Sequence, residues 1–104
     1  MSRYRLAASA QLDLRDIQTE MLKAGGTRLA RYIRAEITRN MLLLADNPKI
    51  GHARADLTDE PVKFWAVFSY LIVYDPAMVP LGIARIVHGA RDLEKLFERQ
   101  PPKA

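Results

Sequence analysis

Apolar side chains recur every three or four positions in two consecutive stretches, the spacing of one face of a helix. The first stretch begins after Ser9, which is placed to cap it. It ends at Gly25-Gly26, because glycine adopts the left-handed conformation of a helix C-cap. The second begins after Thr27 and ends before Pro48, because the residue preceding proline avoids the helical region. So short a link predicts an antiparallel helical hairpin. Its buried stripes are Ala10, Leu14, Ile17 and Met21, then Leu29, Ile33, Ile37, Met41 and Leu44.

A different pattern predicts β-strands on either side of these helices. Residues 2–6 alternate polar and apolar side chains, which predicts a short strand with Tyr4 and Leu6 directed inward. Three later segments are rich in β-branched and aromatic side chains on both faces, as central strands are: residues 62–68, 70–74 and 81–87. Their short connections predict an antiparallel meander. The segment between helices and meander, residues 49–61, lacks periodicity and is predicted to be a loop.

The last part of the chain has helical spacing again. Leu93, Leu96 and Phe97 fall on one side of a short helix predicted over residues 91–99. Residues 100–104 are expected to form a flexible tail. The order of elements indicates one α+β domain over residues 1–99, with the helical hairpin packed on one face of a curled antiparallel sheet.

Composition excludes several kinds of site. The 104 residues are 49% hydrophobic and 27% charged, which is too apolar for a disordered chain. The absence of cysteine excludes disulfides, thiolate metal ligands and a thiol nucleophile, and two histidines cannot form a histidine-rich cluster. We therefore expect no metal and no cofactor. No apolar run approaches the length of about 18 residues that a membrane span needs, and no export signal is recognisable. A cytoplasmic protein without membrane contact is expected.

Positive charge is concentrated in the second predicted helix. The formal net charge is +4, and residues 28–39 contain four arginines but one acidic residue: Arg28, Arg31, Arg34, Arg39 and Glu36. The first helix is predicted to turn its polar side chains to solvent: Asp13, Arg15, Asp16, Gln18 and Glu20. The arginines have two open interpretations. They form a solvated helix face, or they contact an acidic partner, because a guanidinium binds carboxylate or phosphate through two parallel hydrogen bonds.

Several segments occur in a characteristic order. The opening strand runs into Ala10-Gln11-Leu12-Asp13-Leu14, and the apolar run Leu42-Leu43-Leu44 is followed by Asn47-Pro48 and Ile50-Gly51. Next come the strand Tyr70-Leu71-Ile72-Val73-Tyr74 and a closing strand that runs into His88-Gly89-Ala90-Arg91-Asp92. In this order the segments resemble the ParE/RelE toxin superfamily, and ParE more than RelE. The resemblance covers about residues 3–97.

The resemblance implies a toxin of a type II toxin–antitoxin system, of the kind that serves plasmid stabilisation. It implies a cognate antitoxin, bound in a hetero-oligomer through a segment that folds on binding. The usual target of ParE is DNA gyrase, so the implied activity is inhibition by direct contact, without chemistry by the toxin. The residues expected to bind a partner are Arg28, Arg31, Arg34, Arg91, Leu93 and Phe97.

Two alternatives stay open. A RelE-like, ribosome-dependent mRNA endoribonuclease needs an acid or base for proton transfer and cations for the phosphorane charge. The candidates for these roles are His88, Lys63, Arg85 and Arg91. Alternation along the strand weakens a partnership of Arg85 with His88, since it places Arg85 with Leu81, Ile83 and Val87, and His88 opposite with Ile86. His88 also has a structural interpretation, in which it fixes the turn after the strand. The second alternative is an inactive toxin-fold binding module.

Overall fold

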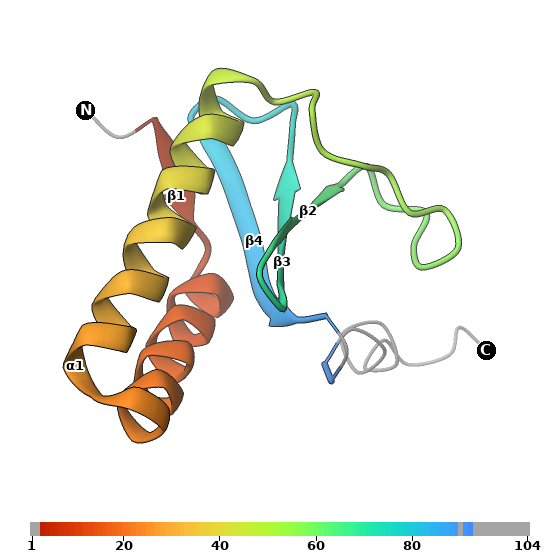
Figure 1. The fold of residues 1–104 in the computed structure, drawn as a ribbon. Coiled ribbons are helices and arrows are strands. Elements are labelled where there is room, and N and C mark those ends of the chain that lie inside the picture. The colour runs from red at the N-terminus through yellow and green to blue at the C-terminus, as the bar shows by residue number, and fades with distance from the viewer. Residues whose placement is uncertain (1–2, 90, 93–104) are drawn as a thin grey trace.

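The computed structural model describes residues 3–89 and 91–92. Within these residues the chain forms a mixed four-stranded sheet with one long, broken helix against it (Figure 1). The elements in chain order are β1 (Tyr4–Leu6), α1 (Ala8–Asp46), β2 (Lys63–Val67), β3 (Tyr70–Asp75) and β4 (Leu81–His88). The strands are arranged in the order β1-β4-β3-β2. The α+β class and the N-terminal strand are therefore as predicted.

Helix α1 is broken at Gly26, whose φ of 79° and ψ of −169° are not helical. Figure 1 shows the two parts, which we call the first arm (residues 8–25) and the second arm (residues 27–46), folded back beside each other. The Gln18 side chain of the first arm donates a 3.0 Å hydrogen bond to the carbonyl of Ala30 in the second. The sequence predicts two helices with a link between them. In the structure this link is the single residue Gly26, so one arm follows the other directly.

The predicted cap at Ser9 is wrong. The helix begins at Ala8, and its N-cap is Ala7, which has no side chain able to accept a capping hydrogen bond. The Ala7 amide instead donates to the carbonyl of Ile83 on β4 at 2.9 Å. This bond to the sheet fixes where β1 ends, so the helix starts two residues earlier than a cap at Ser9 would place it. The other end agrees with prediction, since α1 ends at Asp46 with Asn47 as its C-cap.

The sheet is mixed and not wholly antiparallel. Strands β2, β3 and β4 form the predicted antiparallel meander. Strand β1, however, pairs with β4 in parallel, with Tyr4 opposite Leu81 and Leu6 opposite Ile83. The prediction of an antiparallel sheet is wrong at this edge. The alternation of a three-residue strand shows which side chains face inward but carries no information on the direction of its neighbour, which the connection through α1 sets.

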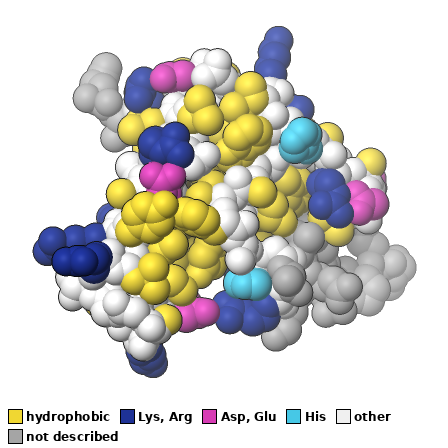
Figure 2. Space-filling view, viewed as in Figure 1, with side chains coloured by type: hydrophobic (Ala, Val, Ile, Leu, Met, Phe, Trp, Pro, Cys, Tyr) yellow, Lys and Arg dark blue, Asp and Glu magenta, His cyan; other side chains and the backbone are white. Residues whose placement is uncertain are grey.

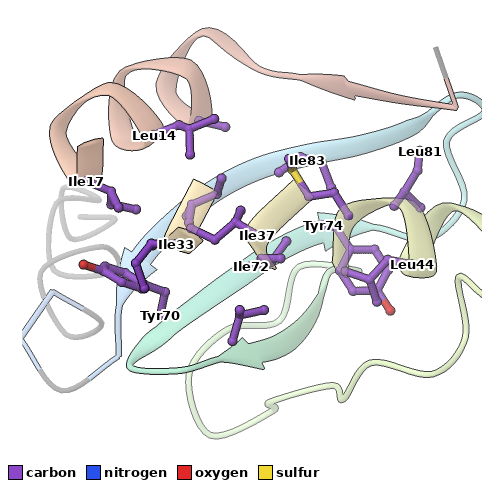
Figure 3. Packing of buried hydrophobic residues seen from close by; sticks show 14 residues of the cluster. Leu14, Ile17, Ile33, Ile37, Leu44, Tyr70, Ile72, Tyr74, Leu81 and Ile83 are labelled. Carbon is purple, nitrogen blue, oxygen red and sulfur yellow. The ribbon is translucent and has the colours of Figure 1, made fainter. Parts of the chain in front are cut away.

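The core lies between α1 and the sheet (Figure 3). The predicted helix stripes are buried except at Met21 and Leu29, which are partly buried at the end of the hairpin. They pack against one face of the sheet, where Ile72, Tyr74 and Ile83 are fully buried. No described helix combines the length and the apolar character needed to cross a bilayer.

Tyr74 also ties the end of α1 to the sheet. Its hydroxyl donates to the carbonyl of Pro48 at 2.7 Å and accepts from the amide of Gly51 at 2.9 Å. A Cβ at Gly51 would collide with this phenol, so glycine is required there for a close approach. The hydroxyl of one buried tyrosine therefore holds the residues that follow the helix against the sheet.

Strand β4 has a bulge. Tyr74 pairs with Ile83 while Val73 pairs with Arg85, which leaves Ala84 as an extra residue. As a result Ile83 and Ile86, three positions apart, both join the core beneath α1. The predicted alternation is therefore wrong at Ile83, which lies on the face of Ile86 and not on that of Arg85, whereas the ladder is regular from Arg85 to His88. The predicted helix over residues 91–99 and the tail over 100–104 lie outside the described residues, apart from Arg91 and Asp92.

Candidate functional site

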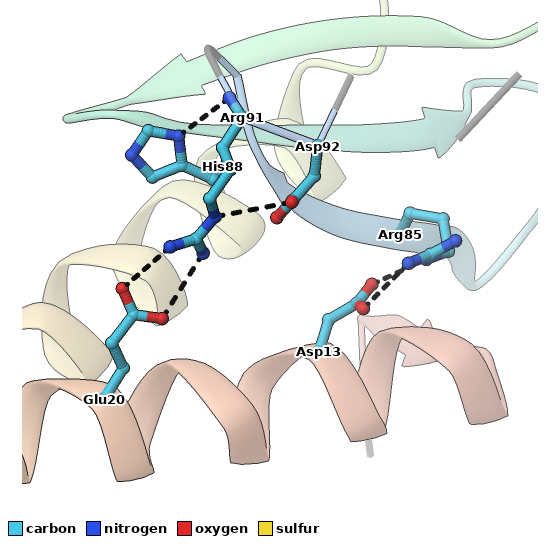
Figure 4. A network of polar contacts seen from close by, with 6 residues as sticks. All are labelled: Asp13, Glu20, Arg85, His88, Arg91 and Asp92. Atoms are coloured by element: carbon cyan, nitrogen blue, oxygen red, sulfur yellow. Dashed lines mark hydrogen bonds and ion pairs between the residues drawn. The ribbon is translucent and has the colours of Figure 1, made fainter. Parts of the chain in front are cut away.

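Ion pairs join the first arm of α1 to β4 and to the segment after it (Figure 4). In the first pair, the Arg85 Nε atom lies 2.7 Å from one Asp13 carboxylate oxygen, and Nη2 lies 3.0 Å from the other. The side chains are 26% and 15% exposed. The hydrogen bond to Asp13 raises the pKa of Arg85 above its usual value. Two nitrogens of this guanidinium bind the same carboxylate, so Arg85 is not presented to solvent as a free cation.

The Asp13 carboxylate has a second role at the bulge. One of its oxygens accepts a 2.9 Å hydrogen bond from the amide of Ile86, just beyond the extra residue of β4. A bulge interrupts the ladder and leaves a strand amide in need of another acceptor. Asp13 supplies it from the helix. The expectation that Asp13 faces solvent is therefore wrong, because periodicity separates polar from apolar positions but does not reveal a polar group that lies above a strand.

The second ion pair holds Arg91. Its Nη1 and Nη2 atoms lie 3.2 and 3.3 Å from the two Glu20 oxygens, and its Nε lies 3.3 Å from an oxygen of Asp92. Hydrogen bonding to Glu20, and then to Asp92, raises the pKa of Arg91. The Arg91 side chain is 53% exposed, so this pair is more accessible to solvent than the Asp13–Arg85 pair. Glu20, predicted to be solvated, is 44% exposed and also binds Arg91 in the segment after β4.

His88 contacts its own turn and a neighbouring strand. Its Nδ1 atom accepts a 3.2 Å hydrogen bond from the Arg91 amide. Its ring meets the edge of Tyr70 with the centroids 5.7 Å apart. Burial raises the pKa of Tyr70 above its usual value. The Nδ1 atom of His88 is therefore already occupied by a backbone amide.

The four candidate nuclease residues do not converge. Lys63 lies at the beginning of β2, level with Tyr74, whereas His88 lies at the end of β4, level with Tyr70 and Val67. About 13 Å of strand separates these two levels. Arg85 and Arg91 are each bound by a carboxylate of the first arm. Among residues 3–89 and 91–92, no cluster of three or more His, Asp or Glu side chains could hold a metal ion.

The residues expected to bind a partner fall in three places. Arg28, Arg31 and Arg34 are all exposed on the second arm. Arg91 lies beyond β4, in the network with Glu20. Leu93 and Phe97 lie outside the described residues.

Sequence reasoning missed an exposed aromatic pair. Tyr32 on the second arm and Phe68 in the turn between β2 and β3 are each 56% exposed, with ring centroids 5.9 Å apart. Phe68 has a φ of 55°, a left-handed conformation that is uncommon for a bulky residue. In Figure 2, apolar side chains gather on the face shown, with basic side chains at its margins. Tyr32 does not belong to the apolar stripe of the second helix, and from this the sequence could have predicted that its ring is exposed.

Comparisons with known proteins find one matching family model and a similar fold. The family model described as "ParE toxin of type II toxin-antitoxin system, parDE" matches residues 4–93. A solved structure of the chromosomal ParDE toxin–antitoxin system from P. aeruginosa is similar in fold, with a TM-score of 0.68 and 17% sequence identity. The match covers 84% of this chain and 98% of that chain. Among curated proteins, none matches this sequence.

Proposed function

The chain belongs to the ParE toxin family of type II toxin–antitoxin systems, and from this premise we propose that it inhibits DNA gyrase by direct binding. A cognate antitoxin binds the toxin in a hetero-oligomer and neutralises it. The toxin acts in the cytoplasm, where it contributes to plasmid stabilisation. The fold similarity to the P. aeruginosa ParDE system is consistent with a toxin scaffold.

The state of the candidate nuclease residues carries this proposal. RNA cleavage without metal needs an acid, a base and cations around one phosphate. Here Arg85 and Arg91 are paired with carboxylates, and Lys63 lies at the other end of the sheet from His88. This arrangement favours action through a protein contact over action through catalysis.

The exposed surface has the chemistry that a protein contact uses. Aromatic and arginine side chains are enriched where protein interfaces bind most strongly. Tyr32 and Phe68 offer two adjacent rings, and Arg31, which precedes Tyr32 in the second arm, is exposed as well. We propose that these groups, together with the expected partner residues Arg28, Arg34, Arg91, Leu93 and Phe97, supply the contacts to gyrase and antitoxin. Gyrase held in this way stops between DNA cleavage and religation, which arrests replication.

A supercoiling and cleavage assay with purified gyrase tests the proposal. We expect the folded toxin to inhibit supercoiling and to accumulate cleaved DNA, and we expect the cognate antitoxin to reverse both effects. A folded toxin without effect on gyrase contradicts the proposal.

Two other outcomes identify the alternatives. Cleavage of ribosome-bound mRNA that is lost in His88→Ala identifies a RelE-like endoribonuclease, with Lys63, Arg85 and Arg91 as the next residues to test. Normal growth when the toxin is expressed without antitoxin, together with retained antitoxin binding, identifies an inactive binding module.

A further inference from the structure

A furrow runs between the two arms of α1. It consists of two hollows of about 510 and 460 Å³. Gln18 and Arg34 line both hollows, so the two are adjacent. The walls come from α1 and from Leu6 at the end of β1, and no residue of β2, β3 or β4 lines them. The furrow is therefore separate from the ion-pair network at the end of β4.

All charged side chains that line the furrow are positive. Four arginines line it, and none of its lining residues is acidic: Arg15, Arg31, Arg34 and Arg39. Arg39 is paired with Glu36 at 2.8 Å. In the described part of the chain, Arg15, Arg31 and Arg34 have no ion-pair partner. Arg15 lines one hollow, Arg31 lines the other and Arg34 lines both, so three guanidinium groups without a carboxylate partner repel one another along the furrow. An anionic occupant relieves a repulsion that no acidic side chain of the lining offsets.

The shape of the furrow limits the occupant. The axes of packed helices lie about 8–10 Å apart, so a furrow between two arms admits one extended chain but not a nucleic acid duplex. No aromatic side chain lines it, whereas single-stranded nucleic acid is bound largely by stacking of its bases on aromatic rings. Its apolar lining includes Leu6, Leu14 and Leu42. Apolar side chains between the arginines suit a peptide that has both carboxylate and apolar groups.

We propose that this furrow binds an extended peptide segment in which acidic residues alternate with apolar ones, and that the segment belongs to the antitoxin. The assignment to the antitoxin rests on the proposed function, whereas the chemistry of the segment rests on the furrow. The inference also divides the predicted arginines. Arg31 and Arg34 line the furrow, whereas Arg28, on the same arm, does not.

Fluorescence anisotropy with a synthetic peptide tests the furrow without gyrase or antitoxin. The probe is a labelled 12-residue peptide in which glutamate alternates with leucine or alanine, titrated with the full chain. The furrow variant Arg31→Glu/Arg34→Glu is expected to bind roughly tenfold more weakly or worse, because charge reversal removes two bidentate contacts. The control variant Lys23→Glu/Lys49→Glu has the same change in charge on exposed residues outside the furrow. It is expected to stay within about twofold of the unsubstituted chain.

A conservative variant protects the test against misfolding. Arg31→Lys/Arg34→Lys keeps the charge but loses the planar fork, so its affinity is expected to fall by about three- to fivefold with an unchanged thermal transition. Equal losses in the furrow and control variants overturn the inference, and so does an unsubstituted chain that does not bind the peptide. Tighter binding of a twelve-residue oligothymidylate than of the peptide overturns it in favour of nucleic acid.

The same variants connect the furrow to the antitoxin. The furrow variant is expected to bind the cognate antitoxin roughly tenfold more weakly than the control variant does. Equal antitoxin affinity in the two variants contradicts that assignment. Failure of the unsubstituted toxin to inhibit gyrase rejects the proposed function but leaves the peptide titration interpretable, so the two failures are distinguishable.

Discussion

Asp13 accepts three hydrogen bonds, two from the Arg85 guanidinium and one from the Ile86 amide. We expect Asp13→Asn to lower the free energy of unfolding by about 1 kcal/mol, because the amide oxygen still accepts from Ile86 while the charge is lost. Asp13→Leu is expected to cost about 3 kcal/mol, because Ile86 and Arg85 both lose their acceptor. Denaturant unfolding measures both changes. Asp16→Asn, exposed on the same arm, should change stability by less than about 0.5 kcal/mol, and equal effects at the two positions would contradict this role.

Tyr74 provides a prediction on pH. Burial raises the pKa of Tyr74, so the folded protein holds the phenol protonated at a pH where the unfolded chain, with a pKa of about 10, has lost the proton. The stability that depends on Tyr74 is therefore fully present below pH of about 10 and is lost as the pH rises further. Tyr74→Phe should cost about 1–3 kcal/mol at neutral pH by removing the partner of Pro48 and Gly51.

The measurement is the difference in unfolding free energy between the unsubstituted chain and Tyr74→Phe, followed from pH 7 upward. The difference should shrink above pH of about 10. A difference that stays constant through that range would show that ionisation of Tyr74 is not coupled to folding. Tyr70→Phe is a useful comparison, since burial also raises the pKa of Tyr70 but its hydroxyl does not tie two loop residues to the sheet.

At the scale of elements, the break in α1 depends on one residue. A Cβ at Gly26 would meet no atom within 4 Å, so a substitution is opposed by backbone conformation and not by crowding. We expect Gly26→Ala to lower the free energy of unfolding by about 1–3 kcal/mol, because an L-residue is strained at this φ and ψ. D-alanine at the same position, introduced by chemical ligation, prefers positive φ and should restore stability. Equal destabilisation by L-alanine and D-alanine would show that the backbone conformation at Gly26 is not the cause of the loss in stability.

The elements also show what the sequence could predict. The stripes through Leu14 and Ile37, and the break at Gly26, follow from local spacing and from the chemistry of glycine, so they could be predicted. The parallel pairing of β1 with β4 and the bulge at Ala84 depend on residues far apart in the chain, and no local pattern encodes them. The ion pairs of Asp13 and Glu20 were missed for the same reason, since a polar position on a helix does not reveal which strand lies above it.

At the scale of the whole molecule, a single core joins both arms of α1 to the sheet. Trp65, the one tryptophan, lies on β2 and donates from its ring to the Asn40 side chain of the second arm at 2.9 Å. We therefore expect its fluorescence and the helical circular dichroism to report one unfolding transition with coincident midpoints. A fluorescence change that precedes the loss of helix would show that β2 and the second arm separate before the core opens.

The parallel pairing of β1 with β4 has a consequence for synthesis of the toxin. The first strand meets its neighbour only through residues 81–83, so it has no partner until β4 has left the ribosome. Contacts between distant parts of a chain form slowly, because a long loop must close before they contribute stability. At about 5–20 residues per second, the nascent chain spends several seconds without a complete sheet. The native surface is therefore incomplete throughout that interval.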